Sequence, residues 1–389
     1  MFRARFKGRV DISPGERPGS YRITARDYVG RVWLAPNRLL YIEPKVEVAN
    51  LFYMLCGATN AVAFYMPPIA LAPRPDIYSL LLRAILDESE RLLTRGLQQD
   101  YAEREESLGL IRGRIALSAQ VSRYGELKER HICRFAELTH DTRENRVVAA
   151  TLRFAAGLLF PETERHLLKR LRELLAHFAG VSPCGRGDAL SSLRQIRKHR
   201  LNMAYWPLLD FCRLLLNGLT LSEHQGRLPF PSFLVNMSQL FETVLTKRLQ
   251  RMIPKNGLRV VAQRHDYLDI SGRVGIRPDI LVCDSTMGKP LLVLDAKYKL
   301  LNSGSDDLNR DIYQISAYMD RYELKRGVLV YPRWERSLNA KQNPTQYRFK
   351  NSPKELFIAT INLAAPGPAA LDQEYTALAE HVSSLVPDL

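Results

Sequence analysis

Apolar and polar residues roughly alternate in the first part of the chain, a pattern typical of half-buried strands. RVWLAP at residues 31–36 and LLYIEPKVEV at 39–48 show it on either side of a short turn. VANLFYMLCGA at 48–58 then predicts a short buried helix, and residues 77–101 predict a long amphipathic one, because leucines and isoleucines recur there at helical spacing. The N-terminal region is therefore expected to begin β-rich and to continue as helix.

Helical periodicity also dominates the middle of the chain. It covers ENRVVAATLRFAAGLLF at 144–160 and ETERHLLKRLRELLAHFAG at 162–180. SPCGRGD at 182–188 interrupts the helices, and residues 185–188 are expected to form a loop. LRQIRKHR at 193–200 is strongly basic. This segment is either a solvated helix face, the interpretation we favour, or a stripe that contacts phosphates.

The C-terminal part combines strand and helix signals. The Pro-rich LPFPS at 228–232 predicts a hinge, and Ser232 is expected to cap a helix that follows it. The next elements give the order helix, strand, strand, helix, strand, which is typical of an α/β core. They are expected at residues 233–250, 274–284, 289–300, 307–322 and 326–332, and after a flexible AAPGPAA break at 364–370 a last helix is expected at 371–385.

The composition is that of a globular protein, with 46% hydrophobic and 25% charged residues among 389. Lys and Arg number 56 against 41 Asp and Glu, and the formal net charge of +15 favours an anionic partner, with nucleic acid first. The cysteines are scattered and no secretory signal is visible, which indicates the reducing cytoplasm. The uncharged stretch at 48–73 is interrupted by polar residues, Gly57 and two adjacent prolines, so we expect no membrane span.

Pro278-Asp279 and Asp295-Ala296-Lys297 form the strongest chemical signal. Side chains alternate along a strand, so Asp295 and Lys297 should share a face, and a paired strand can bring Asp279 beside them. Two carboxylates can hold Mg²⁺, and the lysine can position or deprotonate a metal-activated water or stabilise the developing charge. A surface hairpin ending in ordinary charges is the alternative. LLVL before Asp295 predicts a buried strand, which favours a site for phosphodiester hydrolysis.

The segment RPDILVCDSTMGKPLLVLDAKYK at 277–299, with VNMSQLFETVL before it and DIYQISAY after it, resembles the PD-(D/E)xK nuclease superfamily. Within that superfamily it resembles the McrC subunit of McrBC modified-cytosine restriction systems. LLYIEPKVEVANLFYML, LTRGLQQDYAEREESLGLIRGRI and LTHDTRENRVVAATL are similar to further McrC segments, so the likeness covers about residues 39–332. It implies an α+β multidomain chain whose C-terminal α/β core has a mixed sheet flanked by helices.

The resemblance also implies roles for individual residues. Asp279 and Asp295 match the metal-binding acids, Lys297 matches the catalytic lysine, and the Ala296 carbonyl would be a further ligand. Glu242 matches the helix acid, catalytic and metal-binding, although a solvated glutamate would look the same. Gln314 and Tyr318 resemble a QxxxY element that lies near DNA or the active site, and a solvated glutamine is again the alternative. The implied cofactor is Mg²⁺, with Mn²⁺ as a substitute.

The resemblance implies the cleavage subunit of a GTP-dependent restriction complex. An McrB-like AAA+ GTPase oligomer would be its partner, and double-stranded DNA carrying modified cytosine would be its substrate. Residues 1–135 would couple to the partner, 136–227 would form the helical middle, and 228–389 would form the endonuclease domain. An AAA+ activator with an idle nuclease site and a free-standing RecB-like nuclease remain as alternatives.

Several other sites have no support in the sequence. No GxxxxGK[ST] occurs, so we expect the chain itself to bind no nucleotide through a P-loop. The cysteine spacing does not suit an iron–sulfur cluster, and no GxSxG elbow indicates a serine nucleophile. His131, Cys133 and His140 lack a fourth zinc ligand at finger or ribbon spacing, so structural roles are favoured.

Four arginines and lysines are candidates for binding through charge. Arg277 beside the acids and Lys299 on the face of Asp295 are expected to contact DNA phosphates. Arg112 and Arg114 flank Gly113, which has no side chain to prevent close approach of a partner, and arginine suits bidentate pairing across an interface. We expect these two to couple the chain to its GTPase, although a structural turn would explain Arg-Gly-Arg equally well.

Overall fold

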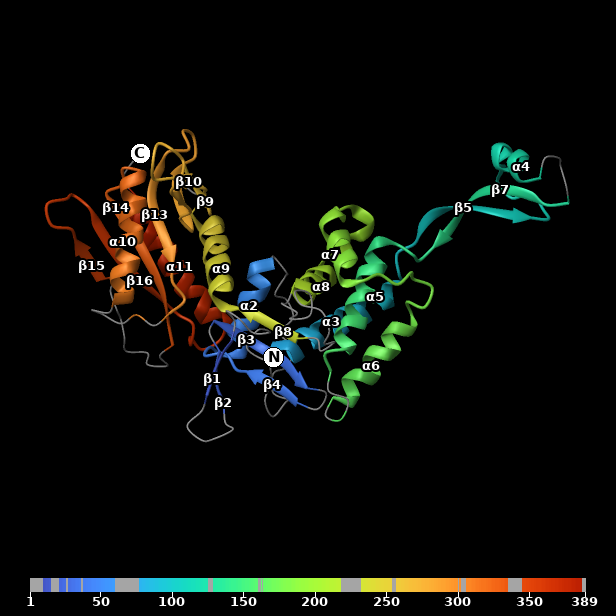
Figure 1. The fold of residues 1–389 in the computed structure, drawn as a ribbon, viewed down its shortest axis with the longest axis horizontal. Helices are drawn as coiled ribbons and strands as arrows, with labels where there is room; N and C mark the ends of the chain where they lie inside the picture. The colour runs from blue at the N-terminus through green and yellow to red at the C-terminus, as the bar shows by residue number, and fades with distance from the viewer. Residues whose placement is uncertain are drawn as a thin grey trace. The chain divides into compact units, whose positions relative to one another are not determined.

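We describe the fold from a computed structural model of the chain (Figure 1). The described residues are 10–14, 21–25, 27–35, 38–59, 77–124, 129–159, 162, 164–217, 232–253, 257–299, 301, 306–334 and 345–386. The Pro-rich segment expected as a hinge lies almost entirely outside them. The chain forms two compact units, one of residues 1–81 with 218–389 and one of residues 82–217. These units differ from the three segments expected from the sequence.

A six-stranded mixed sheet is the centre of the first unit. Its strands lie in the order β15-β16-β14-β13-β12-β9, with β13, β14 and β16 parallel and the other neighbours antiparallel. β13, β12 and β9 are consecutive neighbours, and β9 is the edge strand on that side of the sheet. The strands are β9 (Leu258–Ala262), β12 (Ile280–Asp284), β13 (Pro290–Ala296), β14 (Arg326–Arg333), β15 (Thr345–Arg348) and β16 (Glu355–Asn362).

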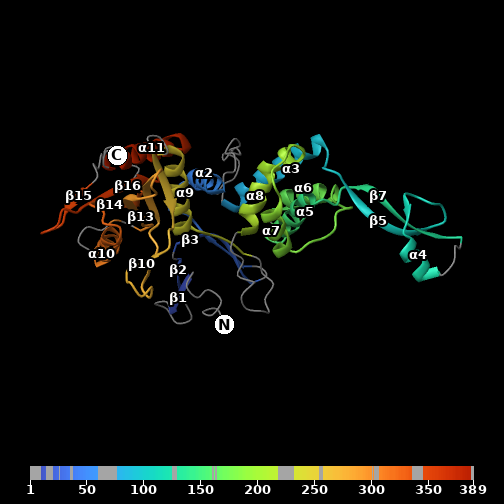
Figure 2. The same ribbon diagram turned by 90° about the horizontal axis from the view of Figure 1, so that it is seen from above.

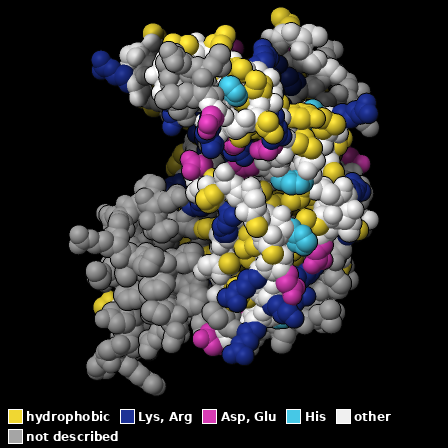
Figure 3. Space-filling model, turned by 90° about the vertical axis from the view of Figure 1, so that its right-hand side faces the viewer, with side chains coloured by type: hydrophobic (Ala, Val, Ile, Leu, Met, Phe, Trp, Pro, Cys, Tyr) yellow, Lys and Arg dark blue, Asp and Glu magenta, His cyan; other side chains and the backbone are white. Residues whose placement is uncertain are grey.

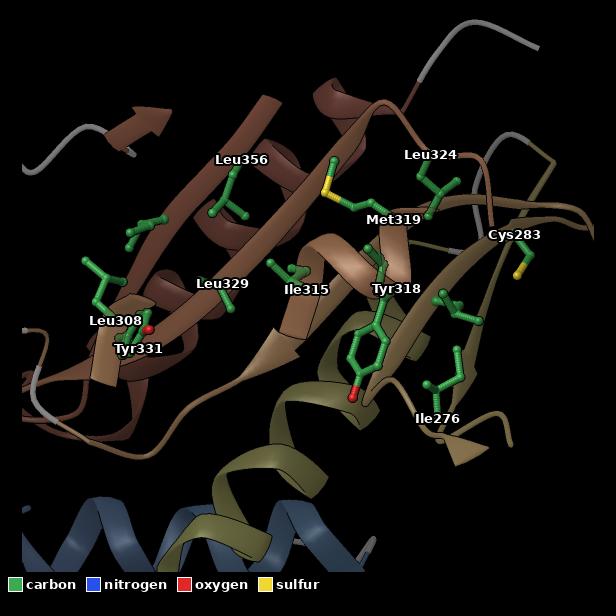
Figure 4. Packing of buried hydrophobic residues seen from close by; sticks show 13 residues of the cluster. Ile276, Cys283, Leu308, Ile315, Tyr318, Met319, Leu324, Leu329, Tyr331 and Leu356 are labelled. Atoms are coloured by element: carbon green, nitrogen blue, oxygen red, sulfur yellow. The ribbon is translucent and has the colours of Figure 1, made fainter. Parts of the chain in front are cut away.

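Helices cover both faces of this sheet (Figure 2). α10 (Asp306–Arg321) packs on β13 and β14, and the cluster in Figure 4 fills this layer with alternate strand residues such as Leu281 and Leu329. α9 (Met237–Met252), α11 (Pro368–Leu385) and α2 (Val48–Thr59) contact one another, and α9 and α11 also contact the sheet. Burial on both faces explains why the predicted strands are almost continuously apolar.

The N-terminal strands join this unit through long-range pairing. β3 (Tyr28–Ala35) pairs with β4 (Arg38–Ile42) and with β8 (Ser232–Asn236), all antiparallel. The expected helix start at Ser232 is wrong, because residues 232–236 are extended and pair with β3. Asn236 caps α9 instead, accepting a hydrogen bond of 3.1 Å from the Gln239 N–H. A separate two-stranded sheet pairs β1 (Val10–Pro14) with β2 (Tyr21–Ala25).

The second unit contains a three-stranded antiparallel sheet and a group of helices. The sheet order is β5-β7-β6, and α5 packs against α6, α7 and α8. The elements are α3 (Ile77–Arg95, shared with the first unit), β5 (Asp100–Leu108), β6 (Arg114–Ile115), α4 (Leu117–Tyr124), β7 (His131–Thr139), α5 (Arg143–Ala156), α6 (Arg165–Ala176), α7 (Arg186–Gln195), the 3₁₀ helix η2 (Arg200–Tyr205) and α8 (Trp206–Asn217).

Further expected boundaries are wrong. The loop expected at 185–188 is the start of α7, which begins at Arg186. The helix expected over 77–101 ends at Arg95, because Gly96 takes φ +85°, a left-handed conformation that commonly terminates helices, and Asp100 already begins β5. The break expected at 364–370 is partly helical, because Pro368 occupies the first turn of α11, where its fixed φ suits a helix start. No described helix is long and apolar enough to cross a membrane.

Candidate active site

Two aspartates, the half-buried Asp279 and the buried Asp295, meet at one edge of the six-stranded sheet. Asp279 directly precedes β12 and Asp295 lies near the end of β13, and these antiparallel strands place Ile280 opposite Leu294. The backbone N–H of Ala296 donates a hydrogen bond of 2.8 Å to Asp279 Oδ2, and Asp295 is only 2% exposed. The strand pairing therefore brings the acids together, as expected from a strand that pairs beside Asp295.

Lys297 lies on the same side of the strand as Asp295. Its Nζ is 2.6 Å from Asp295 Oδ2, because side chains two residues apart point to one face. Tyr298, between Lys297 and Lys299, points to the other face, and its ring centroid lies 6.0 Å from that of Phe241 on α9. The strand thus directs the acid and the lysine toward the layer that contains α10.

α10 supplies the polar groups that face this lysine. Gln314 Oε1 accepts a hydrogen bond of 2.7 Å from Lys297 Nζ, and Gln314 Nε2 donates one of 2.8 Å to the Tyr318 hydroxyl. Gln314 and Tyr318 are four residues apart on one face of the helix. The structure therefore brings both residues of the predicted QxxxY element to the acid–lysine group.

Asp311 is a buried member of the site that the sequence analysis missed. Its carboxylate lies 2.8 Å from Lys299 Nζ and 3.9 Å from Lys297 Nζ, and it accepts a hydrogen bond of 2.6 Å from the Tyr331 hydroxyl. A signal was present, because Asp311 precedes Gln314 by one helical turn. Lys299, expected to contact phosphates, is thus partly engaged by an internal carboxylate.

Glu242 approaches the site from α9. Gln263 Nε2 donates a hydrogen bond to its carboxylate, and the Arg277 guanidinium donates to the side-chain oxygen of the same glutamine. Gln263 was not predicted, and nothing in the sequence around it singles it out. The predicted Glu242 and Arg277 are therefore linked to each other through it, beside the aspartates.

The site carries more buried negative charge than its lysine balances. Burial raises the pKa of Asp279 to about 7, and the negative charges of Asp295 and Glu242 add to the effect. Burial also raises the pKa of Asp295, although Lys297 opposes that shift. Burial alone would lower the pKa of Lys297, but Asp295 and Asp311 outweigh it and raise the pKa. Lys297 is therefore a charged ammonium group at neutral pH.

The donor set fits a hard divalent cation in part. Asp279 and Asp295 supply carboxylate oxygens, the ligands that Mg²⁺ prefers, and their raised pKa values indicate that a cation would be stabilised there. Within the described ranges, however, no three His, Cys, Asp or Glu side chains converge closely enough to hold one ion. The geometry thus supports the two aspartates as ligands and leaves Glu242 outside a common ligand set.

Arg112 and Arg114 belong to the second compact unit, in the segment that leads into β6. The Arg112 guanidinium stacks 4.2 Å from the Phe135 ring centroid and lies 3.6 Å from Glu137, while Arg114 is exposed. A Cβ on Gly113 would lie 2.5 Å from the Arg134 carbonyl oxygen, so only glycine permits this approach of the two strands. Figure 3 shows the molecule from the right-hand side of Figure 1, where cationic side chains lie among hydrophobic and acidic ones.

The sequence matches known proteins over most of its length. Residues 23–332 match the family described as McrBC 5-methylcytosine restriction system component. The type IV methyl-directed restriction enzyme EcoKMcrBC of Escherichia coli K12 is 23% identical, over 84% of this chain and 95% of that protein. A chain from a refined half-complex of Thermococcus gammatolerans McrB AAA+ hexamers with bound McrC has the same fold, with a TM-score of 0.65, 19% identity and coverage of 97% of this chain and 86% of that one. The protein is therefore a member of the McrBC 5-methylcytosine restriction system component family.

Proposed function

We propose that this chain is the Mg²⁺-dependent DNA endonuclease subunit of a GTP-dependent restriction complex directed at modified cytosine. The observation that carries the proposal is the pairing of the half-buried Asp279 with the buried Asp295, with the Lys297 ammonium 2.6 Å from the second. Family membership supports a role in restriction, and the net charge of +15 suits a polyanionic substrate.

Asp279 and Asp295 would hold the metal, and the Ala296 carbonyl is a further candidate ligand. When bound, Mg²⁺ would activate a water and neutralise charge on the phosphate. Lys297 is already protonated at neutral pH because the nearby carboxylates raise its pKa, so we assign it to stabilisation of the developing negative charge and not to proton removal. Gln314 holds the lysine in place through its hydrogen bond. Arg277 is an exposed cation two residues before Asp279, and we assign it to orienting the phosphodiester.

We further propose that the chain docks on an AAA+ GTPase and stimulates it. The support is the fold shared with a chain of the McrB–McrC assembly and, within the second unit, the exposed Arg112 and Arg114. A fragment ending near residue 225 is unsuitable for testing this coupling, because it would remove β8 from its pairing with β3. Point variants of the full chain are the appropriate tools.

A cleavage assay of the full chain tests the nuclease proposal. Modified DNA is incubated with the chain and Mg²⁺, with and without an McrB-like AAA+ GTPase and GTP. We expect cleavage only in the complete mixture. Asp279→Ala, Asp295→Ala and Lys297→Ala should each reduce it by at least about 10²–10³-fold while GTPase stimulation persists.

Asp284→Asn is the matched control, because this half-buried aspartate is the last residue of β12 and lies at the opposite end of that strand from Asp279. Cleavage by all three site variants at the wild-type rate would refute the site. Cleavage by the chain with Mg²⁺ alone would favour a free-standing nuclease. GTPase stimulation without any cleavage would favour a regulatory subunit with an idle site.

A further inference from the structure

A narrow β-ribbon extends beyond the sheet at the edge where the aspartates lie. β9 and β12 pair up to Ala262 and Ile280, and the same two segments pair again as β10 (Asp266–Tyr267) and β11 (Gly275–Ile276). Figure 1 shows β10 beside β9. The ribbon of residues 266–276 therefore continues two strands of the sheet, and its second strand leads within three residues into Asp279.

The tip of this ribbon, residues 268–274, presents apolar side chains to solvent. Leu268 and Val274 are about half exposed, and Ile270 is fully exposed. Adjacent exposed apolar groups on a soluble protein indicate a binding surface more often than isolated ones do. The tip therefore has the character of a contact element.

Hydrogen bonds hold both the tip and the base of the ribbon in place. In the tip, the Asp269 carboxylate accepts from the N–H groups of Arg273 and Val274 at 2.9 and 2.7 Å. At the base, Arg321 donates to the Tyr267 carbonyl at 2.6 Å and to the Asp266 carboxylate at 3.0 Å. Arg321 is the last residue of α10, which also carries Gln314 and Tyr318, so the ribbon has a fixed place relative to the site.

The charge of the ribbon suits a polyanion. Its acids are engaged internally, Asp266 with Arg321 and Asp269 with backbone N–H groups. The exposed Arg273 guanidinium has no ion partner within the part of the chain that the structure describes. Arg264 and Arg277, both exposed, flank the base of the ribbon. Arg273, beside the apolar tip, is thus available to phosphates and base edges.

We propose that this ribbon enters the major groove of duplex DNA beside the phosphate that is cut, an inference that rests on the proposed nuclease function. The major groove is about 12 Å wide and admits a two-stranded β-ribbon, whereas the minor groove is about half as wide. Ile270 contacts methyl groups that project into the groove, and Arg273 binds a guanine edge or a phosphate. A protein partner or a second copy would fit the apolar tip but would leave the arginines without acidic partners.

The test compares two double variants of the full chain. Ile270→Ser with Arg273→Ala changes the tip. Met287→Ser with Arg259→Ala removes one exposed apolar and one exposed basic side chain at the opposite end of β9, β12 and β13. Binding of a short fluorescent duplex is measured in EDTA, so that cleavage does not interfere. The tip variant should bind at least about tenfold more weakly than wild type, and the matched variant within about twofold.

The position of the tip on DNA is tested separately, with iron–EDTA tethered to Ile270→Cys. The control is the wild-type protein treated in the same way, because its partly exposed Cys184 could also react with the iron–EDTA reagent. Strand scission with the stagger that marks the major groove, next to the natural cut, would support the proposal. Equal DNA binding by the two double variants, scission from the minor groove, or a tip variant that only dissociates a dimer would overturn it. If DNA binding depends on the tip but the wild-type protein cleaves no DNA, only the nuclease proposal is refuted.

Discussion

Gln314, in the middle of α10, accepts a hydrogen bond of 2.7 Å from the ammonium group of Lys297, which directly follows β13. The two residues are 17 positions apart in the chain, and this bond fixes the lysine between the strand and the helix. Because Gln314 also donates to Tyr318, its amide orientation is determined by two partners. A lysine held in this way is already ordered before a phosphate binds, so contact with the phosphate costs no further rotamer entropy.

Gln314→Ala should therefore slow cleavage by about tenfold while leaving DNA affinity within about twofold. Loss of the amide frees the Lys297 side chain, which must then be ordered in each turnover. Single-turnover cleavage and fluorescence binding measure the two quantities. Ser316→Ala, a nearby substitution in the same helix, is the control. Equal losses of rate and affinity would show that Gln314 acts by binding DNA instead.

Asp279 should make the metal-free protein less stable as the pH rises. Its pKa is about 7 in the folded state, against about 3.9 in an unfolded chain, so between these values the unfolded state loses a proton that the folded state keeps. The free energy of unfolding then falls with increasing pH and levels off above pH 7. Asp279→Asn should raise the melting temperature at pH 8 by at least about 3 °C, and little at pH 4.

Thermal unfolding in EDTA checks this prediction. Added Mg²⁺ should stabilise the wild type and so reduce the difference in melting temperature between the two proteins. Asp284→Asn is the control, because hydrogen bonds from Thr286 lower the pKa of that aspartate, the direction opposite to the shift of Asp279. A lower melting temperature for Asp279→Asn at pH 8 would contradict the charge balance that we describe.

The second unit should lose stability in acid through Asp141. Its carboxylate accepts two hydrogen bonds of 2.7 Å from Arg146, and Ser182 donates two more. These bonds, with Arg146 first, hold the pKa of Asp141 well below its usual range. The stabilisation is complete above the unfolded pKa of about 4 and is lost as the pH falls toward the folded value.

Asp141→Asn should lower the free energy of unfolding at pH 7 by about 1–3 kcal/mol, with a smaller difference in strong acid. Urea unfolding at pH 7 and pH 2.5, monitored through a probe in the second unit, measures it. The exposed Glu162→Gln should have no comparable effect. A difference independent of pH would show that packing, not charge, underlies the loss.

Arg114→Ala should reduce stimulation of the GTPase more than Arg112→Ala does. Arg112 is partly engaged by Phe135 and Glu137, whereas Arg114 is exposed and, among the described residues, has no ion pair. We expect a loss of about tenfold or more for Arg114 if it meets the nucleotide site of the partner. GTP turnover at saturating chain concentration measures this, with Arg95→Ala as the control. Unchanged turnover in both variants would assign Arg-Gly-Arg to the turn alone.

The acid–lysine group could be located from the sequence because its determinants are local. LLVL before Asp295 marks a buried strand, the two-residue period places Lys297 on the same face, and the short turn after β12 brings Asp279 alongside. The helices at 48–59, 143–156 and 237–252 were also largely predictable, because a continuous apolar stripe records which face will be buried. These features depend on residues close together in the chain.

Long-range contacts decided the rest. The pairing of β8 with β3 places residues separated by about two hundred positions in one sheet, and no local pattern near Ser232 distinguishes that strand from a helix start. β5 is a highly charged strand with little apolar alternation, so the sequence did not predict its pairing with β7. Asp311 and Gln263 joined the site only because α10 and β9 pack beside it. A local pattern records which side of an element is buried, but only the tertiary structure determines which side chains meet there.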